Sequence, residues 1–403
     1  MILTEKAYLR ADGRKGIRNH LLVIYLVECA HHVAREVAWP YRDRGVQLGG
    51  FGGCYPNEYS AEMMRSLCTH PNVGAVLLVS LGCEGFDRWR LRSAIEASGR
   101  PLHTLVIQQE GGTRKTIAEG RAWVEKTLAT LEQVPRASLR LDELIVGTVC
   151  GGSDATSGLT ANPGIGRCFD LLVEAKATCI FEETGELIGC EEIMAARAVT
   201  PELAGILRES VEKAARYYTI MGHGSFAPGN AEGGLTTQEE KSMGAYSKSG
   251  SSKISGLIKP GDVPGRGGLY LLDVVPDGEP RFGFPNINDN AEIAELIACG
   301  SHVILFSTGR GSVVGSAISP VIKVCANPET FRRMGEDMDV DGGRILEGRG
   351  TLDEVGREIL QLTREVAAGK ASVSEGLGHQ EFVLTYKSFE PVGPACHPTY
   401  QTA

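Results

Sequence analysis

Several common features are absent from this sequence, and their absence excludes whole classes of protein. Among the 11 cysteines of its 403 residues there is no Cys-x-x-Cys pair, and only 6% of the residues are aromatic. An odd cysteine count without such pairs argues against a disulfide framework and against a zinc ribbon. The net charge is -9 and no block of lysine and arginine occurs, so we expect no nucleic-acid partner.

Long apolar runs are also missing. No stretch of about 18 apolar residues is available to cross a bilayer, and the segment Met1 to Lys6 lacks the apolar core of a signal peptide. No Gly-x-Gly-x-x-Gly follows the first predicted strand, so we expect no nucleotide cofactor. These absences predict a cytoplasmic protein that does not enter a membrane.

What is present is a regular alternation of short apolar strands and longer helical segments, in a chain with 42% hydrophobic residues and 51 glycines. This pattern predicts the α/β class, with two consecutive doubly wound, mostly parallel units at 1–135 and 136–403 and a glycine-rich active-site loop region at 221–262. Residues 135–141 read as the linker between the units. The predicted strands are 21–27, 46–49, 73–80, 102–108, 144–149, 178–182, 268–275, 302–306 and 320–325, and the predicted helices are 29–44, 57–69, 87–98, 113–132, 165–176, 191–218 (with a break at Pro201), 290–299 and 353–368.

The strand 144–149 runs into a turn rich in glycine and hydroxyl groups. Gly151 and Gly152 free the backbone to turn, and the segment from Ser153 to Ser157 offers side-chain and amide donors to an oxyanion such as a carboxylate. Candidate substrate-binding residues in this turn are Ser153, Asp154, Thr156 and Ser157. The alternative is an ordinary strand-to-helix turn with a serine cap.

Acidic and thiol side chains follow the carboxyl ends of other predicted strands, the edge at which open α/β sheets bind ligands. Mixed carboxylate and thiolate ligands suit Fe(II), Mn(II) or Zn(II), so these residues predict a divalent metal. The candidate ligands are Cys83, Cys150, Glu182, Glu183 and Glu186. The alternative for the run at 182–192 is a solvated helix start, because acidic residues also favour helix amino termini.

An arginine-rich segment precedes the first apolar strand. Arg14, Arg18 and Asn19 stand beside Gly13 and Gly16, and arginine binds carboxylates through two parallel hydrogen bonds. The segment is therefore a candidate clamp for an acidic substrate, or alternatively a solvated entry loop.

Further candidates lie in the second half of the chain. His223 stands between two glycines, where it could act as a base or a ligand, although an exposed histidine without a role is the alternative. The strand 302–306 leads into another hydroxyl-rich turn that carries an arginine, and the strand 320–325 holds Lys323. The remaining candidates are Asn230, Thr236, Thr237 and Thr308 for substrate binding and Arg310 for catalysis.

Taken together and in this order, several motifs resemble the altronate and galactarate dehydratase family, specifically its large domain, over residues 7–368. The motifs are Arg10-x-Asp12-Gly13-Arg14-x-Gly16-x-Arg18-Asn19, Cys150-Gly151-Gly152-Ser153-Asp154, Asn162-Pro163, Glu182-x3-Glu186-x2-Gly189, Gly229-Asn230-x2-Gly233-Gly234-Leu235-Thr236-Thr237, Thr308-Gly309-Arg310-Gly311 and Glu336-Asp337-Met338-Asp339.

The resemblance implies a metal-dependent lyase, for which we expect Fe(II) or Mn(II), that removes water from a sugar acid and leaves a 2-keto-3-deoxy acid. Relatives in such a family expel other leaving groups from hydroxy acids. The substrate carboxylate is expected at Arg14, Arg18 and the turn at 153–157, and the proton transfers at His223 or Lys323. Family members often carry a small β-rich domain before the large one, so we expect that part as a separate small subunit, together with self-association into a homo-oligomer. The alternative is a binding or regulatory subunit that holds a small carboxylate without turning it over.

Overall fold

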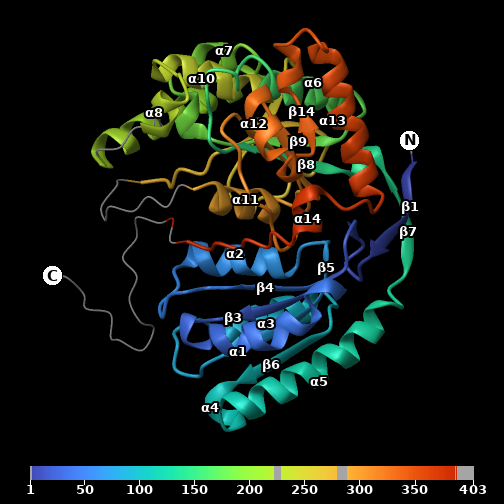
Figure 1. Ribbon diagram of the computed structural model, residues 1–403. Coiled ribbons are helices and arrows are strands. Elements are labelled where there is room, and N and C mark those ends of the chain that lie inside the picture. The colour runs from blue at the N-terminus through green and yellow to red at the C-terminus, as the bar shows by residue number, and fades with distance from the viewer. Residues whose placement is uncertain (1, 222–227, 279–287, 386, 388–403) are drawn as a thin grey trace, which may run out of the picture.

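The computed structural model describes residues 2–221, 228–278, 288–385 and 387. Two parallel sheets with helices on both faces confirm the predicted doubly wound α/β fold (Figure 1). The layers follow one another from helices α6 and α13, through the larger sheet, a middle layer with α11 and α2, and the smaller sheet, to helices α1 and α5.

The smaller sheet is built from residues of the first unit. Its four strands are parallel in the order β4-β3-β5-β6, and β5 is buried along its whole length because it is apolar and lies inside the sheet. Asn57 and Ser60 form a capping box that starts α2. The elements are β3 (His20–Tyr25), α1 (His31–Ala38), β4 (Val46–Gly50), α2 (Glu58–Cys68), β5 (Val73–Ser80), α3 (Arg88–Ala97), β6 (Leu102–Val106), α4 (Ile107–Glu110) and α5 (Thr113–Leu131), with 3-10 helices at Glu28–Ala30 and Trp39–Arg44.

The larger sheet has seven parallel strands in the order β10-β11-β9-β8-β12-β13-β14. Its strands are β8 (Ile145–Cys150), β9 (Thr178–Phe181), β10 (Ile254–Ile258), β11 (Gly268–Leu272), β12 (Val303–Thr308), β13 (Val321–Cys325) and β14 (Val340–Asp341). Its helices are α6 (Ala161–Glu174), α7 (Glu191–Ala195), α8 (Pro201–Met221), α9 (Pro228–Glu232), α10 (Gln238–Tyr246), α11 (Asp289–Ala298), α12 (Pro328–Met334), α13 (Leu352–Ala367) and α14 (Val373–Leu377). The 3-10 helices are η3 (Leu141–Glu143), η4 (Thr184–Leu187), η5 (Ser247–Ser249), η6 (Gly335–Asp337) and η7 (Gly343–Ile345).

The segment predicted as a linker is a strand. β7 (Arg136–Arg140) pairs antiparallel with β1 (Ile2–Leu9), which also pairs with β2 (Lys15–Gly16). Polar and apolar residues alternate over only a few positions in this segment. So short a pattern does not predict a strand when the pairing strand is unknown. This small antiparallel sheet runs along the side of the molecule and joins the two parallel sheets (Figure 1).

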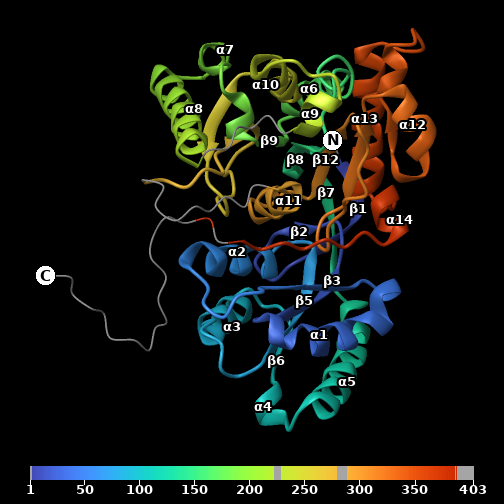
Figure 2. The same cartoon turned by 60° about the vertical axis from the view of Figure 1, so that its left-hand side comes forward.

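The two parallel sheets share one hydrophobic core. Leu22 and Ile24 of β3 belong to the same buried cluster as Leu296 of α11 and Phe306 of β12. The chain from 378 to 385 runs through this middle layer (Figure 2). Phe382 of this segment packs against the cluster. The outer faces of the two sheets have cores of their own, under α6 and α13 on one side and under α1 and α5 on the other.

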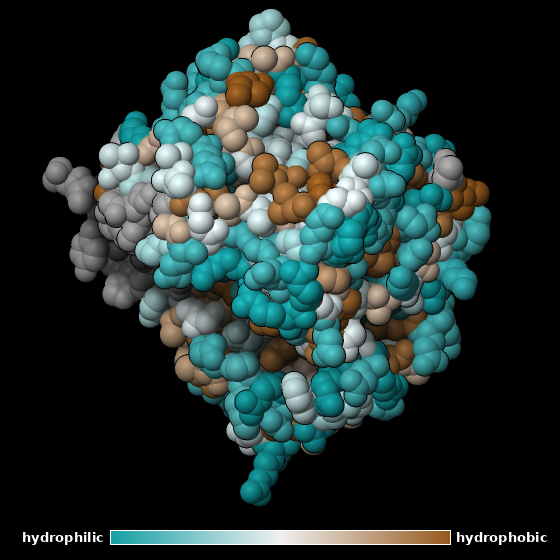
Figure 3. All heavy atoms as spheres, turned by 45° about the horizontal axis from the view of Figure 1, so that its top comes forward, coloured by the Kyte–Doolittle hydropathy of each residue, from teal (hydrophilic) through white to brown (hydrophobic). Residues whose placement is uncertain are grey.

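The predicted glycine-rich loop region is more ordered than its composition indicates, since its described part contains α9, α10, η5 and β10. Helix α6 begins before Pro163 rather than after it, because proline is tolerated in the first turn of a helix. The break predicted at Pro201 separates α7 from α8. Within the described residues, no helix has the length and apolar character that crossing a membrane requires. The face in Figure 3 is largely hydrophilic, with apolar side chains in small separate patches.

Candidate active site

Two adjacent strands at the centre of the larger sheet bring three predicted ligands together. β8 and β9 are parallel neighbours, so Cys150 at the end of β8 lies beside the residues that follow β9. The thiol sulfur of Cys150 lies 3.3 Å from Glu183 Oε2 and 3.2 Å from Glu186 Oε2. The candidate ligand atoms of these residues all lie within 4.8 Å of one another, which is the spacing that a single metal ion needs. We call Cys150, Glu183 and Glu186 the thiol–carboxylate group.

The backbone of Glu183 is held in an unusual conformation. Its φ is 85° and its ψ 49°, in the left-handed region that residues with a side chain rarely adopt. The Cys150 backbone N–H donates to Glu183 Oε1, which helps to hold this carboxylate at the end of β8. Such conformations outside glycine cluster at functional sites, where the surrounding structure maintains them.

Two buried lysines, which sequence reasoning missed, face the group. Lys248 of η5 donates to Glu183 Oε2, and Lys241 of α10 donates to Glu186 Oε1. Both lysines come from the region predicted as a glycine-rich loop, and α10 packs against η4. The lysines themselves were visible in the sequence, but nothing in a polar, glycine-rich stretch indicates which lysines are buried.

A second set of buried carboxylates adjoins the first. Ligand atoms of Glu182, Glu183 and Glu292 also lie within 4.8 Å of one another. Glu182 is 1% exposed, and neither of its carboxylate oxygens has a hydrogen-bond partner among the described residues. Glu292 comes from α11 and was not predicted, because a helix that is buried on all sides carries no amphipathic signal.

Burial and mutual repulsion govern the protonation of these groups. Burial, and then the neighbouring Glu186, raise the pKa of Glu183 to about 7. Burial also acts to raise the pKa of Glu186, but Lys241 and Lys248 outweigh it, so that this pKa is lowered. Burial, followed by the charges of Glu183 and Glu186, raises the pKa of Cys150 well above its usual value. A divalent cation would counteract the raised pKa values of Cys150 and Glu183, since a metal ion deprotonates a thiol that coordinates it.

The turn after β8 is organised by Asp154. Its Oδ1 accepts hydrogen bonds from the Thr156 backbone N–H at 2.9 Å and from the Thr156 hydroxyl at 2.6 Å. Ser157 Oγ donates to the same oxygen at 3.2 Å, and Asn327 Nδ2 donates to Oδ2 at 2.8 Å. Ser153 Oγ lies 3.5 Å from Cys150 Sγ. Ser153 is therefore the hydroxyl of this turn that contacts the thiol–carboxylate group, while Thr156 and Ser157 hold Asp154.

Comparison with known families supplies the decisive observation. The model described as D-galactarate/altronate dehydratase, C-terminal, matches residues 141–389, and the model for the second domain of D-galactarate dehydratase/altronate hydrolase matches residues 7–132. The chain belongs to the D-galactarate/altronate dehydratase family.

Individual relatives agree with this assignment. The β subunit of (2R)-sulfolactate sulfo-lyase from Chromohalobacter salexigens is 33% identical over 393 residues, covering 94% of this chain and 96% of the relative. Altronate dehydratase of Escherichia coli K12 is 28% identical over 394 residues, covering 94% of this chain and 76% of the relative. Galactarate dehydratase (L-threo-forming) of the same organism is 32% identical over 317 residues, covering 76% of this chain and 58% of the relative.

Other residues of the dehydratase-family motifs lie near the same sheet edge but have structural partners. Thr308, at the end of β12, donates from Oγ1 to the Gly152 carbonyl at 3.3 Å. Arg310, in the turn after β12, donates to the Gly229 carbonyl and, at 3.2 Å, to Glu232 Oε2. These bonds attach α9 to the turn after β12. Asn230 is buried in α9.

The two threonines that follow α9 serve α10. Thr237 Oγ1 accepts from the Glu240 backbone N–H at 3.1 Å and so caps the helix. Thr236 donates from its backbone N–H and its hydroxyl to Glu240 Oε2, both at 2.8 Å. These two residues position the helix that carries Lys241.

The predicted arginine clamp lies elsewhere. Arg14 and Arg18 precede β3, so they lie at the amino ends of the strands, whereas the thiol–carboxylate group lies at carboxyl ends. Arg14 donates to Asp12 Oδ2 at 2.7 Å and to the Thr69 carbonyl at 2.6 Å. Arg18 donates to both Glu375 oxygens, at 2.7 and 2.8 Å. Their guanidinium groups hold protein partners, and a role for these arginines in binding the substrate carboxylate stays a prediction.

Asn19 of the same segment also has protein partners, since its Nδ2 donates to the Leu131 carbonyl at 2.9 Å and its Oδ1 accepts from Arg10 at 2.6 Å.

The remaining candidates lie away from the thiol–carboxylate group or outside the described residues. Lys323 is fully buried on β13, where its Nζ lies 3.4 Å from His379 Nδ1, and it is not part of the thiol–carboxylate group. Burial lowers the pKa of Lys323. Cys83 is exposed beyond β5 and belongs to neither carboxylate group. His223 lies outside the described residues.

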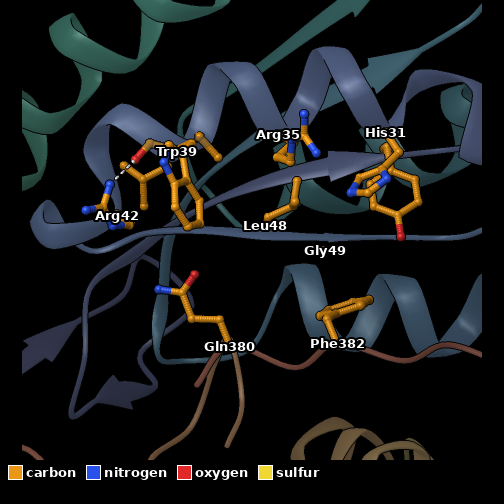
Figure 4. Close-up of a pocket in the computed structure, with 11 residues that line it drawn as sticks. His31, Arg35, Trp39, Arg42, Leu48, Gly49, Gln380 and Phe382 are labelled. Carbon is orange, nitrogen blue, oxygen red and sulfur yellow. Dashed lines mark hydrogen bonds between the residues drawn. The ribbon is translucent and has the colours of Figure 1, made fainter. Parts of the chain in front are cut away.

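A separate cavity of about 270 Å³ lies on the smaller sheet. Arg35 and Trp39 line one side of it, and Gln380 and Phe382 of the C-terminal segment line the other (Figure 4). None of the residues predicted for the active site and described by the structure lines this cavity.

Proposed function

We propose that this chain is a metal-dependent lyase that dehydrates a sugar acid, or a related hydroxy acid, to a 2-keto-3-deoxy acid. The observation that carries the proposal is the thiol–carboxylate group, buried beside two lysines where adjacent strands end. Membership of the dehydratase family supports the reaction class.

The residues present fit a divalent metal. One sulfur and two carboxylates within 4.8 Å are a donor set of mixed softness, which suits Fe(II) or Mn(II). Cys150, Glu183 and Glu186 would hold the ion, with Glu182 adjoining them. Glu182 supports this fit because its carboxylate is buried and has no hydrogen-bond partner among the described residues. When bound, a divalent ion supplies Lewis acidity to oxygen atoms of the substrate.

The lysines supply the remaining positive charge. Lys241 and Lys248 keep their protons, because the carboxylates around them raise the pKa of each despite burial. Two fixed ammonium groups in a buried site attract an acidic substrate and stabilise the negative charge that develops on its carboxylate when the α-proton is removed. We assign them this electrostatic role.

The base that takes the α-proton is proposed to be His223. Its position in the sequence lies between α8, which packs against η4, and α9, after which the Gly233 carbonyl accepts from the Ala155 N–H in the turn after β8. Lys323, the other predicted base, is less suited because its ammonium group faces His379 rather than the thiol–carboxylate group.

A second leaving group is favoured by one specific observation. The relative that matches this chain over 96% of its own length is named a sulfo-lyase subunit rather than a dehydratase. A lyase with the same α-proton chemistry could expel sulfite from C3 of a sulfonated hydroxy acid instead of water. The name of that relative also supports the proposed small partner subunit, and self-association in the cytoplasm completes the proposal.

The test is turnover by the purified chain, alone and with a candidate small subunit, after anaerobic loading with Fe(II) or Mn(II). Altronate, galactarate and (2R)-sulfolactate would be supplied in parallel, with 2-keto acid and free sulfite measured as separate products. With the metal-loaded chain we expect a 2-keto acid from the accepted substrate, accompanied by sulfite only when that substrate is (2R)-sulfolactate, and neither product after chelation. Full activity in a sample verified to be metal-free would contradict metal dependence. Binding of an acid without any product would indicate a carboxylate-binding subunit.

A further inference from the structure

Three neighbouring strands of the smaller sheet each end in a turn that carries a cysteine. β4, β3 and β5 are adjacent and parallel, so their carboxyl ends lie at one edge. Cys29 follows β3, Cys54 follows β4 and Cys83 follows β5. The topology therefore places three thiol-bearing turns side by side at the edge where open α/β sheets bind ligands.

Backbone hydrogen bonds hold these turns against one another. The Glu28 N–H donates to the Gly52 carbonyl at 3.4 Å, which joins the turn of Cys29 to that of Cys54. The Gly85 N–H donates to the Cys54 carbonyl at 2.8 Å, which joins the turn of Cys54 to that of Cys83. The three cysteines thus stand on a fixed backbone frame rather than on independent loops.

Their exposure separates these cysteines from the others. Cys29, Cys54 and Cys83 are exposed free thiols, whereas the other seven described cysteines are buried. A buried free cysteine behaves as a small hydrophobe, but an exposed thiol contributes nothing to a core and is open to oxidation. Neither packing nor a disulfide explains three exposed thiols on adjacent turns.

We infer that Cys29, Cys54 and Cys83 bind a [4Fe–4S] cluster. The three thiols form no group whose ligand atoms lie within 4.8 Å, so within the described structure they are too widely spaced to share one ion. The thiolates of a cubane cluster each bind a different iron and stand further apart. On binding, each thiol releases its proton and forms one Fe–S bond. The fourth iron then has no cysteine ligand and can take an oxygen atom of a small acid.

This site is distinct from the thiol–carboxylate group and does not depend on the reaction proposed above. The larger sheet carries Cys150, and the smaller sheet carries the three exposed thiols. The two proposals therefore fail independently, because one concerns turnover and the other concerns iron and sulfide content.

The test is anaerobic reconstitution of the full chain with sulfide and equal amounts of Fe(II) and Fe(III), so that the mixed-valence cluster forms without a further oxidant. We expect about four irons and four acid-labile sulfides per chain, with the broad visible absorption of a cubane cluster. Cys29→Ser, Cys54→Ser and Cys83→Ser should each lose most of the sulfide and the absorption. Because these side chains are exposed, the apoproteins should keep the melting temperature of the wild type, which separates ligand loss from misfolding.

Two controls sharpen the experiment. Cys150→Ser removes a residue of the other site and should keep the cluster absorption, as should Cys168→Ala, which alters a buried cysteine of the core. Iron bound without sulfide, or a cluster that survives in all three single variants, would overturn the inference. Equal iron content in the wild type and in the triple variant would overturn it as well.

Discussion

At the scale of single residues, Glu186 has two roles, because one oxygen faces the Cys150 sulfur at 3.2 Å and the other accepts from Lys241. Glu186→Gln keeps the shape but removes the charge that a cation needs. Losing a residue that only supports a ligand costs about 10- to 100-fold in metal affinity, so losing a ligand should cost roughly 100-fold or more. Competition with a chelator of known affinity measures this.

The matched control is Glu192→Gln, which changes an exposed glutamate that is ion-paired with Arg208. An exposed pair of this kind contributes about 0.2–1 kcal/mol to stability and should not alter metal affinity. Equal losses of affinity in the two variants would remove Glu186 from the metal site.

Lys248 is the other residue whose replacement is informative, because it is 1% exposed and donates to the buried Glu183. Lys248→Met leaves a buried carboxylate without its partner, which we expect to cost about 3–5 kcal/mol of unfolding free energy in metal-free protein. Adding Glu183→Gln should recover part of that loss. Urea unfolding in the presence of a chelator measures both variants.

Lys253→Met is the control, since Lys253 is exposed and its replacement should cost less than about 0.5 kcal/mol. A divalent metal should restore stability to Lys248→Met, because the ion supplies the missing positive charge. No destabilisation in Lys248→Met would show that Glu183 is not charged in the folded protein.

At the scale of elements, Arg18 connects the start of β3 to α14 and to the end of α13. It donates to both oxygens of Glu375 and, at 3.0 Å, to the Val366 carbonyl. Lysine cannot reproduce this fork, so Arg18→Lys should lower stability by about 1.5–3 kcal/mol and leave substrate affinity unchanged. Thermal melts and substrate titration of the same variant separate the two effects. Weakened substrate binding at unchanged stability would restore the clamp that the sequence predicted.

His302 joins three elements near the amino ends of β8 and β12. Its Nδ1 accepts from the Ile145 N–H at 3.1 Å, and its Nε2 donates to the Lys15 carbonyl at 3.0 Å, so the ring is neutral. Burial lowers the pKa of His302 to about 4. The unfolded chain therefore binds a proton near pH 6.5 that the folded chain does not, and stability must fall as the pH decreases towards 4.

For this one group the loss between pH 7 and pH 5 should be about 2 kcal/mol. His302→Asn keeps an acceptor for Ile145 but cannot titrate, so its stability should decrease less over the same interval. Urea unfolding at several pH values checks the difference. Identical pH dependence in the wild type and the variant would contradict it.

At the scale of the whole molecule, the shared core should couple the two parallel sheets. Leu22 of the smaller sheet and Phe306 of the larger one belong to a single buried cluster. Lys387 of the C-terminal segment donates to Glu295 of α11 at 2.8 Å, and Tyr59 of α2 donates to the same carboxylate at 2.5 Å. We expect one cooperative unfolding transition in calorimetry, with equal calorimetric and van't Hoff enthalpies. Two resolved transitions would show that the units predicted at 1–135 and 136–403 unfold separately.

From the sequence alone one can predict the alternation of strands and helices and the sheet edge at which the thiol–carboxylate group lies. The predicted strand 73–80 coincides with β5. An uninterrupted apolar run with β-branched residues is typical of a strand that is buried on both faces of a parallel sheet. Cys150, Glu183 and Glu186 were predicted because they follow strands, and parallel strands carry such residues to one edge.

Which charged residues surround that edge depends on how the chain folds. Lys241, Lys248 and Glu292 come from segments remote in sequence, and burial of a charged side chain depends on what packs around it rather than on its neighbours in the chain. The same reason explains Arg14 and Arg18. The composition of this segment is that of an anion clamp, but the two arginines pair with Asp12 and Glu375. Glu375 is remote from Arg18 along the chain, so their pairing could not be predicted from the sequence.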